Sequence, residues 1–388
     1  MNELSILAVN VDDALLKPLR EKLNSYICTS YGMKAFHDKK QMSPENVKLS
    51  ALPDVVSALF GRLANWGVVP KYYAYWYRIK TLDLLFSHKI AKDKSKIVYT
   101  SSLFVNTIKK AKKAGKIVVI NAGNSEAARE YQRVMCEYEK YGIKKRYIYG
   151  DKHFRDCRLK GFSLADRVIT ISEMSRDTYA QAGYDMSRFK LIPLTGTDFA
   201  RQSINDSIEK PKVFITTAFH NFVKGTHRLL LAWEKAGIKD IPLVVVGRQC
   251  EDMQEFVNKY GPFKNVKFLG FVKGSLQDFY SQYNAVGVLL SLSEGAVRTT
   301  PELMSFGFPM IVSPDATCDL VKDGYNGFVV DTTDEKTIVE KLRYFAEDWS
   351  RVNSLRTNVL ESVKTRTVRD FSLEVADYLL ELINNAEK

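Results

Sequence analysis

The sequence predicts an α/β protein built from two doubly wound parallel sheets. Short apolar runs of strand length alternate with helical patterns, first along residues 1–200 and again after a polar stretch at 201–212. That polar stretch predicts an interdomain linker, and a length of 388 residues fits about two domains. We therefore expect Rossmann-like domains at 1–200 and 201–365 that face a cleft, with a helix at 366–388 that crosses back to the first domain.

In the first half, each apolar run leads into a helical pattern. The expected strands cover residues 6–10, 96–99, 117–120, 167–171 and 190–193. The expected helices cover the leucines at 15, 16, 19 and 23, and then residues 104–114, 126–142 and 174–182. This alternation predicts a parallel sheet.

The second half repeats the pattern. Its expected strands cover residues 213–217, 243–246, 266–269, 285–290 and 309–312. Its expected helices cover residues 225–236, 250–260, 276–283 and 300–306. Ligands of such folds bind beyond the carboxyl ends of the strands, so the loops that follow these strands are where we look for chemistry.

Composition and charge exclude several classes of protein. Hydrophobic residues make up 45% and charged residues 26%, which excludes wholesale disorder. No apolar run reaches 18 residues, and the N-terminus lacks a basic segment, so neither a transmembrane helix nor a signal peptide is expected. Five scattered cysteines support neither a disulfide framework nor a zinc site and favour a reducing cytoplasm.

The net charge of +12 is concentrated in the first half of the chain. Residues 1–200 carry 34 basic and 20 acidic side chains, whereas residues 201–388 carry 23 and 25. The two halves are therefore expected to meet different partners. No nucleic-acid motif accompanies the charge, so an anionic acceptor or membrane surface is the favoured partner of the basic half.

The stretch 290–312 is the most informative. An apolar strand ends at Ser291, a polar loop carries Glu294, and a helix opens near Thr299 with Glu302 in its first turn. Two carboxylates placed in this way converge at the mouth of the sheet, where helix N-terminal N–H groups suit a phosphate. Gly307 then ends the helix, and the next strand follows.

This stretch resembles the E-x7-E signature of retaining, family 4-type (group 1) glycosyltransferases. The family pattern runs S-x-x-E-G-x-x-R-x-x-x-E-A-M-x-x-G-x-P-V-I. The chain keeps most of it, with Leu303 in place of the usual alanine. Segments 165–173, 190–198, 213–233, 243–247 and 319–331 also resemble the family. The likeness spans roughly residues 115–345 and fades over 1–95.

The resemblance implies a GT-B fold and a nucleotide-sugar held against the second half. Glu302 would then bind the ribose hydroxyls, Glu294 would face the donor sugar, and Lys224 would stabilise the charge that grows on the diphosphate. The remaining residues of the implied donor site are Arg298, Gly295, His220 and Thr299. No metal or other cofactor is implied, because fixed cations replace it.

One position departs from the family pattern. Many members carry an arginine five residues before the lysine, and this chain has Phe219 there, followed by His220. A second cation at the phosphates would then come from Arg298 or from Arg248. The same departure motivates an alternative function, a GT-B-shaped binding or scaffold protein that has lost catalysis.

The acceptor side carries weaker signals. Family members often place a histidine after a strand of the first domain, and Glu126 stands near that position as a candidate base. Asn124 and Ser125 are alternatives. Asp12, in the first strand-to-helix loop, is a further acceptor-side candidate, although that loop lacks the family's paired glycines.

Aromatic and basic residues alternate over residues 69–80. An interfacial membrane helix has this composition, and so does an amphipathic helix packed on the first sheet; both interpretations stay open. The favoured function is a cytoplasmic glycosyltransferase, peripheral on the inner face of a membrane. It would transfer a sugar from a nucleotide-sugar to a glycan or lipid-linked acceptor in surface-polysaccharide assembly.

Overall fold

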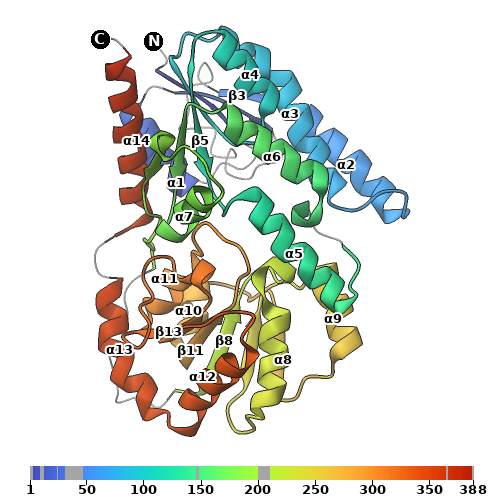
Figure 1. Cartoon of the computed structure of the whole chain (residues 1–388), viewed down its shortest axis with the longest axis vertical. Helices are drawn as coiled ribbons and strands as arrows, with labels where there is room; N and C mark the ends of the chain where they lie inside the picture. Colours follow the sequence, from blue (N-terminus) through green and yellow to red (C-terminus); the bar gives the residue numbers. More distant parts are fainter. Residues whose placement is uncertain are drawn as a thin grey trace.

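The computed structural model describes residues 3–8, 13–23, 25–30, 47–145, 148–199, 210–363 and 366–386. The interdomain linker expected at 201–212 lies mostly outside the described residues, and its last residue, Lys212, already belongs to a strand. Figure 1 shows two α/β domains stacked along the long axis of the molecule, which confirms the predicted fold class.

The first domain holds a parallel sheet whose described strands run in the order β3-β2-β1-β4-β5-β6-β7. The strands are β1 (Leu4–Leu7), β2 (Ser25–Ser30), β3 (Val47–Ser50), β4 (Ile97–Thr100), β5 (Ile117–Ala122), β6 (Arg167–Thr170) and β7 (Phe189–Leu191). Its helices are α1 (Asp13–Lys22), α2 (Leu52–Asn65), α3 (Tyr73–Lys92), α4 (Val105–Lys113), α5 (Ala127–Tyr141), α6 (Lys152–Leu164) and α7 (Glu173–Gln181), with short turns η2 (Ile148–Gly150) and η3 (Met186–Arg188).

The second domain repeats the plan, with described strands in the order β10-β9-β8-β11-β12-β13. The strands are β8 (Lys212–Thr217), β9 (Leu243–Val246), β10 (Val266–Gly270), β11 (Asn284–Leu289), β12 (Met310–Val312) and β13 (Gly327–Val329). Its helices are α8 (Thr226–Ala236), α9 (Glu251–Tyr260), α10 (Leu276–Ser281), α11 (Thr299–Met304), α12 (Glu335–Glu347) and α13 (Ser350–Ser362), with turns η4 (Phe222–Lys224) and η5 (Pro314–Ala316).

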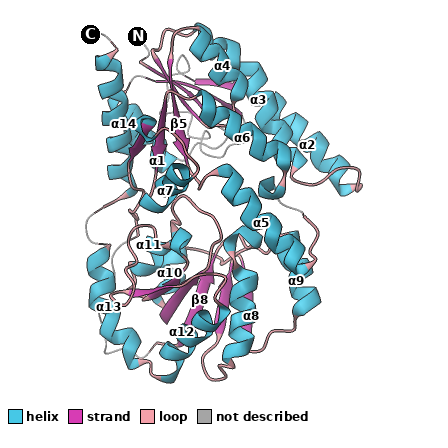
Figure 2. Ribbon diagram, in the orientation of Figure 1, coloured by secondary structure: helices cyan, strands magenta, loops and turns pink. Residues whose placement is uncertain are grey.

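The last helix, α14 (Val368–Asn385), packs against α1 of the first domain (Figure 2). Thr367 caps its N-terminus in a reciprocal capping box with Asp370. Phe371, Val375 and Leu379, one turn apart, are buried in the same cluster as the strands of the first sheet. The chain therefore ends on the domain where it began.

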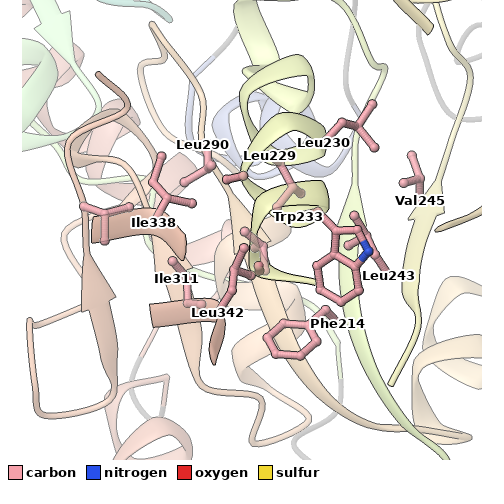
Figure 3. Close-up of a cluster of buried hydrophobic side chains, with 14 of the residues drawn as sticks. Phe214, Leu229, Leu230, Trp233, Leu243, Val245, Leu290, Ile311, Ile338 and Leu342 are labelled. Atoms are coloured by element: carbon pink, nitrogen blue, oxygen red, sulfur yellow. The ribbon is translucent and has the colours of Figure 1, made fainter. Parts of the chain in front are cut away.

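Helix α8 anchors the core of the second domain (Figure 3). The fully buried Trp233 lies against Phe214 of β8, with ring centroids 5.2 Å apart, and the indole N–H donates to the Lys264 carbonyl at 3.1 Å. The same cluster includes Val134 and Tyr138 from α5, a helix that begins in the first domain. One helix thus contributes to both halves, which fixes how their loops meet.

Candidate functional site

Lys224 ends the turn η4 directly after β8. Gly225 follows with φ 65°, a left-handed conformation that favours glycine, and a Cβ at this position would collide with the Leu290 carbonyl oxygen. The Leu292 N–H donates to the Val223 carbonyl at 2.7 Å. The lysine turn is therefore fixed against the loop that follows β11.

The Glu294 carboxylate and the Lys224 ammonium form an ion pair across these two loops. The lysine side chain is 27% exposed and the glutamate 11%, so the pair lies at the edge of solvent. The Glu294 main-chain carbonyl also accepts a 2.8 Å hydrogen bond from the Ser125 hydroxyl of the first domain. Two predicted donor-site residues are thus brought into contact with each other and with the acceptor-side domain.

Gly295 is the point of closest approach between the two domains. A Cβ at this position would collide with the Gly123 carbonyl and with the Asn124 nitrogen. The Ser172 hydroxyl donates to the Gly295 carbonyl from the start of α7. Only glycine fits here. The loop that carries Glu294 and Gly295, called the donor loop below, therefore packs directly against the loops at the strand ends of the first domain.

Glu302 lies half-buried in the short helix α11, whose start is held by a 2.7 Å bond from the Thr300 hydroxyl to the Ala316 carbonyl. Desolvation by burial raises the pKa of its carboxyl to about 7. The Arg298 charge opposes that rise and Asp198 adds to it. Close to neutral pH this carboxyl therefore changes between a hydrogen-bond donor and an ionised acceptor.

The predicted phosphate ligand His220 has both ring nitrogens bonded inside the protein. Its Nε2 donates to the Val246 carbonyl at 2.9 Å, which leaves Nδ1 to accept from the Thr226 hydroxyl at 2.8 Å. Burial lowers the pKa of the ring to about 4, so it is neutral at pH 7. In this arrangement the ring holds the loop after β8 in place and has no nitrogen left for a phosphate.

Phe219, where the family pattern has arginine, is 44% exposed. The Arg248 guanidinium lies over its ring, 5.8 Å from the centroid. The loops after β8 and β9 are joined by a 2.8 Å hydrogen bond from the main-chain N–H of His220 to the main-chain carbonyl of Arg248. Arg248, carried at the end of β9, therefore reaches the surface beside the position where the expected cation is missing.

The acceptor-side candidates fill structural positions in the first domain. The Glu126 carboxylate caps α5 by accepting from the Arg129 N–H at 2.8 Å. The Asn124 amide donates to Glu130 at 3.0 Å, and the Ser125 hydroxyl donates to the Glu294 carbonyl. The fourth candidate, Asp12, lies outside the described residues.

Sequence reasoning missed an ionic contact between the domains. Asp315, in η5 of the second domain, accepts bidentate bonds from Arg129 at 2.8 and 3.0 Å and a third from Arg133 at 2.7 Å. Its side chain is only 1% exposed. The two arginines stand four residues apart on α5 and so share a face, a spacing that could have indicated a common partner.

A second buried contact joins the same two domains. The Glu130 carboxylate pairs with Arg158 of α6, and it accepts a 3.1 Å bond from the Ser293 hydroxyl, next to Glu294.

Across the described ranges, no group of three or more His, Cys, Asp or Glu side chains could hold a metal ion. Within the same ranges, no helix is both long and apolar enough to cross a bilayer.

A known protein family matches part of this sequence. Residues 199–362 match the family model described as glycosyl transferases group 1. No curated protein sequence matches the chain.

Solved structures match over the whole length. The structure of Anabaena Alr3699/HepE in complex with UDP superposes with a TM-score of 0.66 at 15% identity and covers 98% of this chain and 100% of the other. Sucrose-phosphate synthase from Thermosynechococcus elongatus gives a TM-score of 0.70 at 15% identity over 99% and 100%. The lipopolysaccharide outer core galactosyltransferase WaaB, in its apo form, gives 0.59 at 15% identity over 97% and 99%.

These matches agree with the two parallel sheets. The chain has the GT-B fold, and residues 199–362 match the family of group 1 glycosyl transferases.

Proposed function

We propose that this protein is a retaining, metal-independent glycosyltransferase of the family 4 type. It moves a sugar, which we take to be a hexose or a related unit, from a nucleotide-sugar donor to a glycan or lipid-linked acceptor. The observation that carries the proposal is the Lys224–Glu294 ion pair on adjoining loops at the carboxyl ends of the second sheet.

In the proposed mechanism, the donor diphosphate replaces Glu294 as the ion-pair partner of Lys224. Negative charge grows on the diphosphate as the bond to the sugar breaks, and a fixed ammonium stabilises that charge without a metal. The released Glu294 carboxylate then accepts hydrogen bonds from the hydroxyls of the donor sugar. The ion pair therefore keeps both groups oriented before the donor arrives.

Uridine diphosphate is the nucleotide to test first, since Alr3699/HepE was solved with UDP. The proposed role in surface polysaccharide assembly draws support from the fold shared with a lipopolysaccharide galactosyltransferase. The proposed site of work is the cytoplasmic face of a membrane. The surplus of basic residues in the first domain supports this, because such a surface attracts anionic lipid.

The test compares UDP binding with sugar transfer. We expect Lys224→Ala to weaken UDP binding and to abolish turnover of nucleotide-sugars, whereas Lys239→Ala, an exposed lysine of the same domain, leaves both unchanged. Glu302→Ala should likewise abolish turnover. Full activity in that variant would overturn the proposal, and UDP binding without transfer in the wild type would favour the catalytically degenerate binding protein instead.

A further inference from the structure

The first domain contains a cavity of about 280 Å³ at the carboxyl ends of β1 and β4. These neighbouring central strands are where the chain reverses its order of winding, the usual ligand position in an open α/β sheet. The walls come from β1, α1, α3, β4 and α14. They are mostly apolar, with Ile6, Leu16, Leu103, Phe371 and Val375 among them.

No charged side chain lines the cavity among the residues that the structure describes. Its polar groups are uncharged hydroxyls and one amide, and one amide oxygen has no partner among the described residues. The Asn121 amide nitrogen donates to the Tyr99 hydroxyl at 2.8 Å, but the buried Asn121 Oδ1 accepts no hydrogen bond from the protein. A buried acceptor left in this state costs free energy that a ligand hydroxyl would recover.

The cavity lies beside the donor loop. Asn121 stands two residues before Gly123, which Gly295 of the donor loop contacts directly. Ala296, the next residue of that loop, packs against the buried cluster that includes Ile6 and Phe371. A group held in the cavity therefore lies next to the loop that presents Glu294.

We infer that this cavity binds an uncharged apolar group of the acceptor, an alkyl or aryl substituent next to the hydroxyl that receives the sugar. The inference rests on the proposed transferase function. An apolar lining of this size favours such a group, whereas a phosphate or carboxylate would lose its hydration, and none of the described lining residues is a cation that could replace it. The Asn121 Oδ1 accepts from a hydroxyl of the same acceptor.

The test uses alkyl glycosides as probes. Calorimetric titration of the full chain with n-octyl β-D-glucopyranoside, below its micelle concentration, should give binding at least tenfold tighter than with the methyl glycoside. Octanoate, which has a similar chain and a negative charge, should bind no better than the methyl glycoside. Equal binding of the octyl and methyl glycosides would overturn the assignment.

Two variants locate the binding. Asn121→Asp adds a charge to the cavity at constant shape and should weaken octyl glycoside binding at least tenfold; Asn384→Asp makes the same change at an exposed position of α14 and should not. Ser372→Leu fills the cavity from α14 and should act like Asn121→Asp. Retained octyl binding in both folded cavity variants would overturn the inference.

UDP is titrated into every sample. Unchanged UDP binding in the cavity variants shows that the donor domain is intact, so that a loss of octyl binding supports the cavity assignment. Failure of UDP to bind the wild type would instead overturn the proposed function, and the two failures are therefore distinguishable.

Discussion

Glu302 is a residue whose charge depends on pH within the physiological range. Desolvation raises the pKa of its carboxyl to about 7, against an ordinary value of 4.5. If the ionised form accepts from ribose hydroxyls, UDP affinity should rise as the pH increases from 6 to 8. Glu302→Gln should bind UDP more weakly and with a flat pH profile. Calorimetry at several pH values measures both.

The same shift predicts the sign of a stability effect. Between pH 4.5 and pH 7 the native state keeps a proton on Glu302 that the unfolded chain has released, so this residue makes stability fall as the pH rises through that window. Urea unfolding of Glu302→Gln should lack this contribution. A variant whose stability follows the wild type at every pH would contradict the raised pKa.

Arg248 is predicted to supply the cation that Phe219 cannot. Its guanidinium lies over the Phe219 ring at the end of β9. Arg248→Ala should weaken UDP binding by about ten- to a hundredfold, since one charge-assisted hydrogen bond contributes about 1.5–3 kcal/mol. Adding Phe219→Arg to that variant should restore the affinity, because the new arginine stands at the family position. A double variant as weak as the single one would refute the role of Arg248.

At the scale of single residues, the sequence predicted site candidates that belong to short local patterns. Glu294 and Glu302 belong to one loop and helix, and Lys224 belongs to a turn with its own glycine, so local spacing was informative. His220 and Glu126 were placed near the site, but their polar atoms bond Val246 and Arg129. No local pattern reveals such partners.

The helical layer α2–α4 is the element most suited to a membrane surface. Residues 47–116 carry 14 basic and three acidic side chains. Asp54 pairs with Arg78 at 3.0 Å, Asp83 caps α4, and Asp93 bonds Ser5 at 2.7 Å. The acids are thus used internally. The basic excess of this layer, which Figure 1 shows along one side of the first domain, is left to meet solvent.

Helix α2 also carries an exposed apolar stripe within this basic layer. Leu52, Val55 and Leu59 share one face of the helix and are 48%, 61% and 54% exposed, and Trp66 beyond its end is 75% exposed. Trp66→Ala should reduce binding to vesicles that contain anionic lipid, whereas Tyr325→Ala, a 43% exposed aromatic of the second domain, should not. Flotation with neutral and anionic vesicles measures this. Equal binding to both kinds of vesicle would contradict the electrostatic part.

The elements themselves were predicted unevenly. Most of the aromatic stretch 69–80 belongs to α3, which buries Ile79, Leu82 and Phe86, so the packed-helix interpretation is correct for this inner face. An exposed apolar stripe also lies on α2, a helix that was not predicted from the sequence. Strands β2, β3 and β13 were also missed. Strands β2 and β3 mix polar with apolar residues, β13 has only three residues, and sheet pairing holds all three in place.

On the scale of the whole molecule, α5 joins the two domains. Its first turn contacts Asp315, and its C-terminal half is buried with the second domain, where Tyr138 stacks on Phe222 with centroids 4.9 Å apart and donates to Asp252 at 2.9 Å. The sequence predicted two domains correctly as a fold class. It could not predict that one helix serves both, because the contacts join residues more than 80 positions apart along the chain.

Glu137 of α5 makes this junction dependent on pH. Its carboxylate accepts from His227 Nε2 at 2.7 Å and from Arg228 Nε at 2.9 Å. Burial alone would raise the pKa of Glu137, but the bonds to His227 and Arg228 outweigh it and lower the pKa to about 2. The stabilisation is therefore present above pH 4.5 and is lost as the pH falls toward 2.

Glu137→Gln should remove that stabilisation at neutral pH. The variant leaves the Arg228 charge facing a neutral amide, so the free energy of unfolding should fall by about 3 kcal/mol at pH 7. The difference from the wild type should shrink as the pH falls below 4.5, because the unfolded wild-type chain then takes up a proton that the native carboxylate, with its pKa of about 2, does not. Glu139→Gln, an exposed position on the same helix, should follow the wild type throughout. Urea unfolding from pH 3 to pH 7 measures all three proteins, and a difference that stays constant across this range would show that the carboxylate charge does not hold the junction.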